Sequence, residues 1–217
     1  MIRGAVFDLD GTITDSNPFW DRAPVVFLES LGIEAEPELG RIIFSMTVPE
    51  AVEYMIKRYS LLLTPGEFSE GMRRIMGHFY AKEVGLKPGI TDILKLLKAK
   101  GIAMAIATVT ERELVEKALD RHGIADYFEG IVTAYDAGAG KQDPAVYLMA
   151  AEKTGSRPEE TLVFEDALHA LRTAKDAGFV TVGVFDEASR EVQDELRHTA
   201  GLYLPDYMDL SGLTAVL

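Results

Sequence analysis

The chain has 217 residues, which is enough for one substantial hydrophobic core or for a core with a small inserted domain. Its 35 Asp and Glu residues outnumber its 22 Lys and Arg residues, and the resulting net charge of −13 disfavours nucleic acid and anionic membranes as partners. The sequence contains no cysteine, which excludes disulfides and thiolate metal sites. No apolar run approaches the roughly 20 residues of a membrane span, and the N-terminus has no signal-peptide cleavage site, so we expect a cytoplasmic protein.

The first predicted elements are one strand and a block of helices. Residues 2–7 form a short apolar run typical of a buried strand, and an Asp-Leu-Asp-Gly turn signal follows it at residues 8–11. From residue 16 to about residue 85 the apolar residues recur with helical spacing. Capping-box patterns begin at Thr47 and at Thr64. The sequence therefore predicts an all-helical segment directly after the first strand.

From residue 86 onward, short apolar strands alternate with helices. The predicted elements are helix 90–100, strand 102–107, a helix capped by Thr110, strand 130–133, helix 143–153, strand 161–164, a helix ending at Ala177, and strand 180–184. This alternation predicts an α/β fold with a mainly parallel, Rossmann-like sheet in a three-layer core. The helical block interrupts that pattern, so we expect a core domain of residues 1–15 and 86–217 and an inserted α-helical cap domain of residues 16–85.

Several polar residues stand where predicted strands end or helices begin. Ligands of open parallel sheets bind beyond the carboxyl ends of the strands, so these residues are candidates for one site. The candidates are Asp8, Asp10, Thr108, Lys141, Glu165 and Asp166. Each alone has an ordinary explanation, such as an Asx turn, a capping hydroxyl or a solvated lysine. Their joint occurrence at strand ends, in this order, favours a functional site.

These motifs resemble the four ordered motifs of the haloacid dehalogenase superfamily. The resemblance rests on Asp8-Leu-Asp10-Gly-Thr12, then Thr108, Lys141 and the pair Glu165-Asp166. The helical insertion resembles the type 1 cap of that superfamily, in the branch that contains phosphoglycolate phosphatases and sugar-phosphate phosphatases and mutases. The resemblance therefore implies a Mg²⁺-dependent phosphatase that acts on a small phosphate monoester.

The resemblance also assigns a role to each site residue. It implies that Mg²⁺ is held by the Asp8 carboxylate, the Asp10 backbone carbonyl and Asp166. Asp8 would be the nucleophile that forms an aspartyl-phosphate, and Asp10 the general acid and then the general base. Chemistry requires such a cation, because a phosphate dianion and a carboxylate nucleophile repel each other.

Three further residues would support this chemistry. Thr108 would hold the transferring phosphoryl group, and the Lys141 ammonium would offset negative charge on the nucleophile and on the phosphoryl oxygens. Glu165 would lie behind the metal site and orient Lys141 or a water molecule on the metal.

Two other functions stay open on the sequence. A phosphosugar mutase of the β-phosphoglucomutase type is disfavoured, because Trp20 occupies the place where that branch typically carries a histidine. A non-catalytic binding module that kept the fold is disfavoured because both Asp8 and Asp10 are present.

The sequence does not identify the substrate, and we expect a monomer or weak homodimer. Polar residues of the helical block that could contact a leaving group are Arg41, Ser45, Lys57, Arg58, Arg73, Arg74 and His78. Phe19 and Trp20 either line that pocket or pack the core of the cap.

Overall fold

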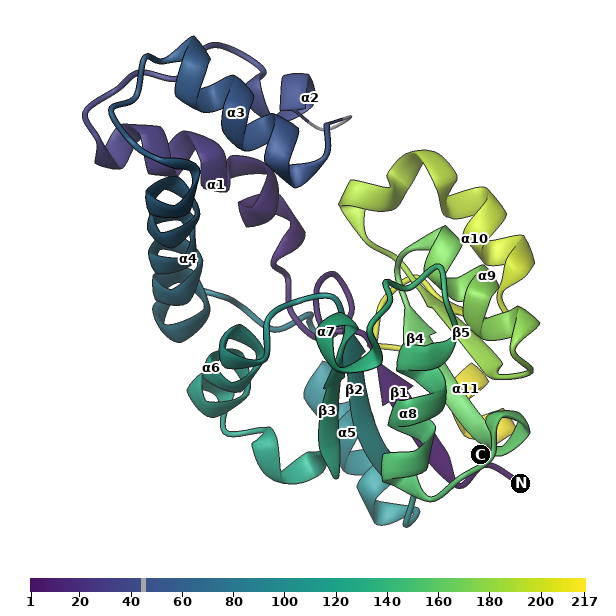
Figure 1. The fold of residues 1–217 in the computed structure, drawn as a ribbon. Helices are drawn as coiled ribbons and strands as arrows, with labels where there is room; N and C mark the ends of the chain where they lie inside the picture. The colour runs from purple at the N-terminus through teal and green to yellow at the C-terminus, as the bar shows by residue number, and fades with distance from the viewer. Residues whose placement is uncertain (44–45) are drawn as a thin grey trace. The chain divides into compact units, whose positions relative to one another are not determined.

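The computed structural model describes residues 1–43 and 46–217, and in it the chain forms two compact units. The first unit comprises Met1–Ser16 together with Val84–Leu217, and the second comprises Asn17–Glu83. Both are drawn in Figure 1 and are described separately here. Within the described residues, no helix is both long and apolar enough to cross a membrane.

The first unit is built on one six-stranded sheet in which all paired strands are parallel. The strand order is β3-β2-β1-β4-β5-β6. The strands are β1 (Gly4–Phe7), β2 (Ala103–Thr108), β3 (Gly130–Thr133), β4 (Thr161–Glu165), β5 (Val180–Val184) and β6 (Leu202–Leu204). The predicted α/β, Rossmann-like class is confirmed.

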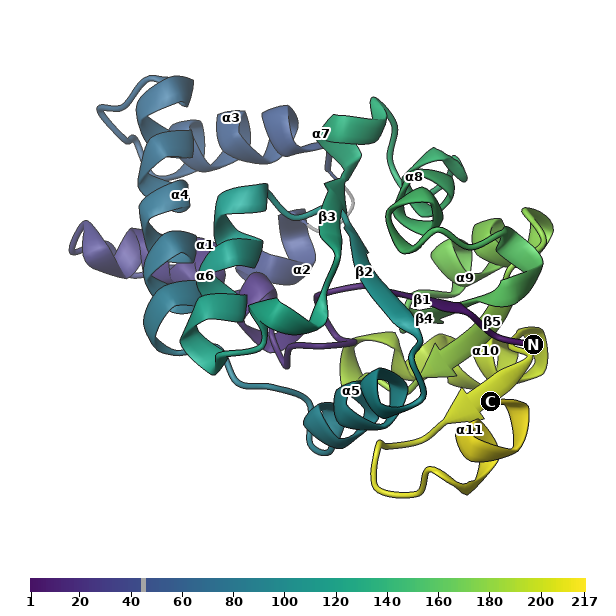
Figure 2. The ribbon, with the colours of Figure 1, turned by 90° about the horizontal axis from the view of Figure 1, so that it is seen from below.

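Helices cover both faces of this sheet and give the three layers. They are α5 (Ile90–Ala99), α6 (Arg112–His122), α7 (Ala134–Ala137), α8 (Ala145–Thr154), α9 (Leu168–Asp176), α10 (Gln193–Thr199) and α11 (Ser211–Val216). In Figure 2, α5 lies across the sheet from α8 and α9. The central strands β1, β2 and β4 are buried on both faces, which is why their sequences are continuous apolar runs rather than alternating ones.

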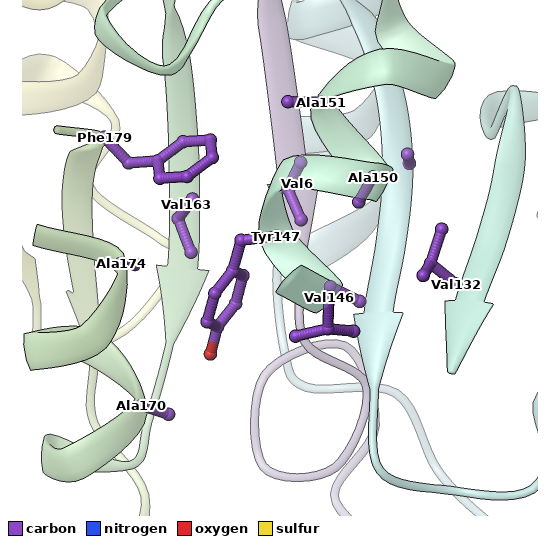
Figure 3. Packing of buried hydrophobic residues seen from close by; sticks show 12 residues of the cluster. Val6, Val132, Val146, Tyr147, Ala150, Ala151, Val163, Ala170, Ala174 and Phe179 are labelled. Carbon is purple, nitrogen blue, oxygen red and sulfur yellow. The ribbon is translucent and has the colours of Figure 1, made fainter. Parts of the chain in front are cut away.

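The face of the sheet under α8 and α9 carries a compact apolar cluster (Figure 3). Val6 and Val163 from neighbouring strands contribute to it, and Tyr147 and Ala150 from α8 pack over them. On the opposite face the alternating residues Phe7 and Phe164 stack with 4.2 Å between ring centroids. Burying a side chain of this size stabilises the fold by about 1.5–3 kcal/mol, so the central strands are firmly anchored.

The second unit contains only helices among its described residues. They are α1 (Asn17–Ser30), α2 (Leu39–Ile43), α3 (Val48–Arg58) and α4 (Pro65–Lys82). Both predicted capping boxes form: the Thr47 N–H donates to Glu50 Oε2 at 2.8 Å, and the Thr64 N–H donates to Glu67 Oε2 at 2.8 Å. A separate core of buried residues, Phe27, Leu28, Leu39, Met55, Leu61 and Phe68, holds these helices together.

The structure corrects the sequence analysis at several elements. The short helices α2, α7, α10 and α11 and the last strand β6 were not predicted, because each is too short for a periodic pattern to emerge. Thr110 was predicted to cap α6, but the residue before that helix is Glu111. Thr110 instead uses its hydroxyl in a tertiary hydrogen bond to Asp10.

Candidate active site

The site lies where the strand order reverses. β2 and β3 extend from one side of β1, whereas β4, β5 and β6 extend from the other. The carboxyl ends of β1 and β4 therefore flank a topological switch point, the usual place for a ligand in such sheets. Asp8 follows β1, and its backbone N–H donates to the carbonyl of Phe164 in β4 at 3.0 Å. This bond brings Asp8 next to Glu165 and Asp166.

The loop after β1 is shaped by hydrogen bonds to a single carbonyl. The Leu9 carbonyl accepts from the backbone N–H groups of Ile13 and Thr14, each at 2.8 Å, and from the Thr14 hydroxyl at 3.1 Å. Gly11 has a φ of 81°, in the left-handed region that residues with a side chain rarely adopt. The turn therefore requires glycine at this position, which explains the turn signal in the sequence.

Lys141 joins the acids that come from different strands. Lys141 lies in the loop that precedes α8, and its ammonium donates to both Asp8 Oδ1 and Glu165 Oε1. Lys141, Asp8 and Asp166 are each 5% exposed, and Glu165 is fully buried. Buried charges of this kind persist only when they are paired or when they bind an ion, so the cluster is a built feature of the fold.

The carboxylates of Asp8, Glu165 and Asp166 form a cluster in which one oxygen from each lies within 4.8 Å of the others. Three carboxylates face the single ammonium of Lys141, which leaves an excess of two negative charges when all are ionised. In addition, Glu165 Oε2 has no hydrogen-bond partner among the described residues. The charge excess and the unpaired oxygen fit a hard divalent cation with oxygen ligands.

The electrostatics of the cluster follow from its burial. Burial raises the pKa of Asp8 well above its ordinary value, although the nearby Lys141 charge opposes this. Burial, together with the charges of Glu165 and Asp186, raises the pKa of Asp166 to about 7. For Lys141, burial pushes the pKa down, but the charges of Asp8 and Glu165 outweigh it and the pKa rises. The lysine therefore stays charged while the acids lack full compensation.

Asp10 is held by two hydroxyl groups rather than by the acidic cluster. Ser16 Oγ donates to Asp10 Oδ1 at 2.6 Å, and Thr110 Oγ1 donates to Asp10 Oδ2 at 2.5 Å. Thr110 is in turn positioned by Thr108, whose hydroxyl oxygen accepts from the Thr110 backbone N–H at 3.0 Å. The loops after β1 and β2 thus meet at the Asp10 carboxylate.

The structure adds residues to the site that the sequence analysis did not select. Asp186, two residues after β5, is 2% exposed and accepts from Lys87 Nζ at 2.8 Å. The buried hydroxyl of Tyr207 donates to the Thr12 carbonyl at 2.9 Å. Asp186 could have been found by the rule that selected Asp166, because it also follows a buried strand. Tyr207 carried no such signal, because the C-terminal segment shows no clear periodicity.

The described polar candidates of the second unit form ion pairs with glutamates of that unit. Arg58 binds Glu36 at 3.0 Å, and Lys57 binds Glu53 at 2.6 Å. The other described candidates, Arg41, Arg73, Arg74 and His78, also lie within ion-pair distance of glutamates of the same unit. Ser45 lies outside the described residues. These contacts favour solvated faces over preformed binding groups.

The two aromatic candidates pack against α4 of their own unit. The Phe19 ring stacks on Phe79 with 3.8 Å between centroids. The Trp20 indole N–H donates to the hydroxyl of Tyr80 at 2.9 Å. Of the two alternatives left open by the sequence, these contacts favour packing within the helical segment, although Trp20 remains 39% exposed.

Comparison with known proteins supplies a family and several relatives. The family described as haloacid dehalogenase-like hydrolase matches residues 5–184. A phosphorylated carbohydrates phosphatase of Thermotoga maritima is 28% identical over 178 residues, which cover 82% of each chain. A phosphoglycolate phosphatase of Yersinia pseudotuberculosis is 30% identical over 191 residues, covering 84% of this chain and 81% of the relative. A T. maritima crystal structure described as a candidate β-phosphoglucomutase aligns over the full length of both chains, with 25% identity and a TM-score of 0.85.

Proposed function

Since the chain belongs to the haloacid dehalogenase-like hydrolase family, we propose that it hydrolyses a small phosphate monoester with Mg²⁺, through an aspartyl-phosphate on Asp8. The family expected from the sequence is confirmed, and so is the class of enzyme, a phosphoric monoester hydrolase. The observation that carries the finer proposal is the buried cluster in which Lys141 binds both Asp8 and Glu165, with Asp166 alongside.

The Asp8 carboxylate, the Asp10 backbone carbonyl and Asp166 would hold the metal. Mg²⁺ bound there offsets negative charge on the cluster and on the phosphoryl group. Support comes from the excess of two negative charges, and from the raised pKa of Asp166, whose ionised form needs compensation. Mg²⁺ rather than a softer metal suits a site made only of oxygen ligands.

Asp8 is the nucleophile in this proposal. Its carboxylate oxygen attacks phosphorus, the bond from phosphorus to the ester oxygen breaks, and the phosphoryl group remains on Asp8. Lys141 keeps Asp8 oriented through its hydrogen bond to Oδ1. Its charge also stabilises the negative charge that the phosphoryl oxygens carry during transfer.

Asp10 moves the protons. In the first half-reaction its carboxyl group gives a proton to the departing ester oxygen, and in the second it takes a proton from the attacking water. The hydrogen bonds from Ser16 and Thr110 fix the carboxylate between two hydroxyl groups. Thr108, fully buried at the end of β2, binds a phosphoryl oxygen through its hydroxyl.

The segment predicted as a cap, residues 16–85, would select the leaving group. The compact unit of residues 17–83 supports this proposal. The relatives named for phosphorylated carbohydrates and for phosphoglycolate support a small phosphate ester as substrate. A cytoplasmic monomer or weak homodimer that does not bind nucleic acid stays a prediction.

A phosphosugar mutase is the second candidate, supported by the likeness to a structure described as a candidate β-phosphoglucomutase. A mutase of this type needs a group that assists proton transfer at the substrate. At position 20 the chain offers an indole that donates its N–H to Tyr80, and an indole is not a base. Following isomer formation from a sugar bisphosphate distinguishes the two activities.

The proposed function is tested by a hydrolysis screen over a panel of phosphate monoesters with Mg²⁺, using Asp8→Asn as the matched control. The panel should include sugar phosphates, phosphoglycolate and nucleoside monophosphates. We expect phosphate release by the wild type and less than about 1% of that rate by the variant. Release at equal rates by both proteins would show that Asp8 is not the nucleophile.

A further inference from the structure

A tyrosine hydroxyl lies in the apolar layer under α8, beside the active site. Tyr147 is fully buried, and its hydroxyl donates to Glu165 Oε1 at 2.7 Å. In Figure 3 its ring lies among apolar side chains, and the hydroxyl oxygen points toward the carboxyl ends of the strands. Phe179 contacts the ring from its edge, with 6.2 Å between centroids. Phenylalanine would fill this apolar space equally well, so packing alone does not account for the hydroxyl.

The two carboxylate oxygens of Glu165 differ in their hydrogen-bond partners. Oε1 accepts from both Lys141 and Tyr147, whereas Oε2 has no hydrogen-bond partner among the described residues. Leaving a buried acceptor unpaired costs about 1–3 kcal/mol, and more for a charged group. Lys141 and Tyr147 thus both donate to Oε1, and the part of the chain that the structure describes places no donor at Oε2.

The phenol acts as a permanent donor at this position. Burial and the neighbouring Glu165 charge raise the pKa of Tyr147, so its proton is retained throughout the physiological range. The Lys141 ammonium also lies 5.9 Å from the centroid of the Tyr147 ring. Tyr147 therefore contacts both the acid and the cation that flank Asp8.

We propose that Tyr147 is a positioning residue: its hydroxyl holds the Glu165 carboxylate in one orientation, in which Oε2 is available to the divalent cation site. This inference rests on the metal site of the proposed function. Groups that orient the surroundings of a metal typically change metal affinity or activity by about 10- to 100-fold when they are removed.

The test compares Tyr147→Phe with Tyr203→Phe as a matched control. The Tyr203 hydroxyl also donates within the first unit, to Gln193 Oε1 at 2.9 Å, but it lies on β6 and bonds a neutral amide. Two readouts are taken as functions of Mg²⁺ concentration: the rise in Tm, which needs no substrate, and the hydrolysis of p-nitrophenyl phosphate. We expect Tyr147→Phe to need about tenfold more Mg²⁺ in both readouts. Tyr203→Phe should match the wild type.

A double-mutant cycle tests whether Tyr147 acts through Glu165. In a Glu165→Ala background, adding Tyr147→Phe should change the Mg²⁺ requirement by less than about twofold, because the side chain that the hydroxyl orients is gone. The same tenfold change in both backgrounds would overturn the proposal. A Tyr147→Phe protein with a lower Tm but the wild-type Mg²⁺ dependence would also overturn the proposal, because a hydrogen bond with a purely structural role gives that result.

The two readouts separate this inference from the proposed function. If Mg²⁺ raises the Tm of the wild type but no ester is hydrolysed, the proposed function fails, and the Tm series still decides the role of Tyr147. If Mg²⁺ neither raises the Tm nor supports hydrolysis, there is no cation site and the inference falls.

Discussion

Replacing Asp166 with asparagine should stabilise the metal-free protein at alkaline pH. Burial and neighbouring acids raise the pKa of Asp166 from its ordinary value of 3.8 to about 7. A group with a raised folded pKa contributes stability that is fully present below its unfolded pKa and is lost as the pH rises through its folded pKa. The wild type should therefore lose stability between about pH 4 and pH 7, and asparagine cannot titrate.

The magnitude follows from the pKa difference. A difference of about 3 corresponds to about 4 kcal/mol, at 1.36 kcal/mol for each pKa unit. Somewhat more than a third of this is already lost at pH 5, so the advantage of Asp166→Asn should grow by roughly 2–3 kcal/mol between pH 5 and pH 8. For a chain of this size, that corresponds to a Tm difference that widens by about 5–10 °C.

The assay is thermal unfolding in EDTA at pH 5 and pH 8. Asp120→Asn on α6 is the matched control, because it makes the same substitution at an exposed aspartate outside the buried cluster. Adding Mg²⁺ at pH 8 should raise the Tm of the wild type more than that of Asp166→Asn. A Tm difference between Asp166→Asn and the wild type that is equal at the two pH values would refute the reasoning, because the Asp166 carboxylate would then carry no burial cost.

The remaining predictions concern turnover. Asp8→Asn should fold normally, as judged by its Tm, and keep below about 1% of the wild-type rate, because the nucleophile is gone; a larger remaining rate argues against covalent catalysis. Asp10→Ala should slow hydrolysis of a poor leaving group by about 10²- to 10⁴-fold, and a loss below about tenfold would assign the proton transfer elsewhere. EDTA should abolish steady-state activity and Mg²⁺ restore it, with Asp166→Ala raising the Mg²⁺ requirement more than Glu165→Ala; the reverse order would exchange their roles. Replacing residues 18–83 with a short Gly-Ser linker should leave slow p-nitrophenyl phosphate hydrolysis and remove the preference among natural esters, and an unchanged preference would place specificity in the core.

The residues at strand ends were predictable because a parallel sheet gives them a common edge. Once the apolar runs ending at Phe7 and Phe164 were placed as strands, Asp8 and Asp166 had to follow them at that edge. The structure confirms the parallel pairing that brings them together. The roles of these residues in catalysis stay predictions.

The side-chain contacts were not predictable, because they join residues far apart in the chain. Thr110 shows this: its spacing to Glu113 is that of a capping box, but the hydroxyl lies close enough to Asp10 to donate to it instead. Tyr147 is a second case, because the sequence pattern placed it only within the predicted helix 143–153. The partner of its hydroxyl depends on the neighbouring strand β4. Local patterns thus predicted backbone elements, and tertiary proximity determined the hydrogen bonds.

The central claim, that Asp8 carries the phosphoryl group, is tested most directly by acid-quenching the enzyme during turnover and mapping the modified residue by mass spectrometry. The account predicts an acid-stable, hydroxylamine-sensitive acyl phosphate on the peptide that contains Asp8. With p-nitrophenyl phosphate, whose leaving group needs little protonation, the amount of this acyl phosphate should increase in Asp10→Ala, because the variant then mainly lacks the base of the second half-reaction. Phosphate release with no phosphorylated Asp8 at any quench time, or with the phosphoryl group on another residue, would contradict the account.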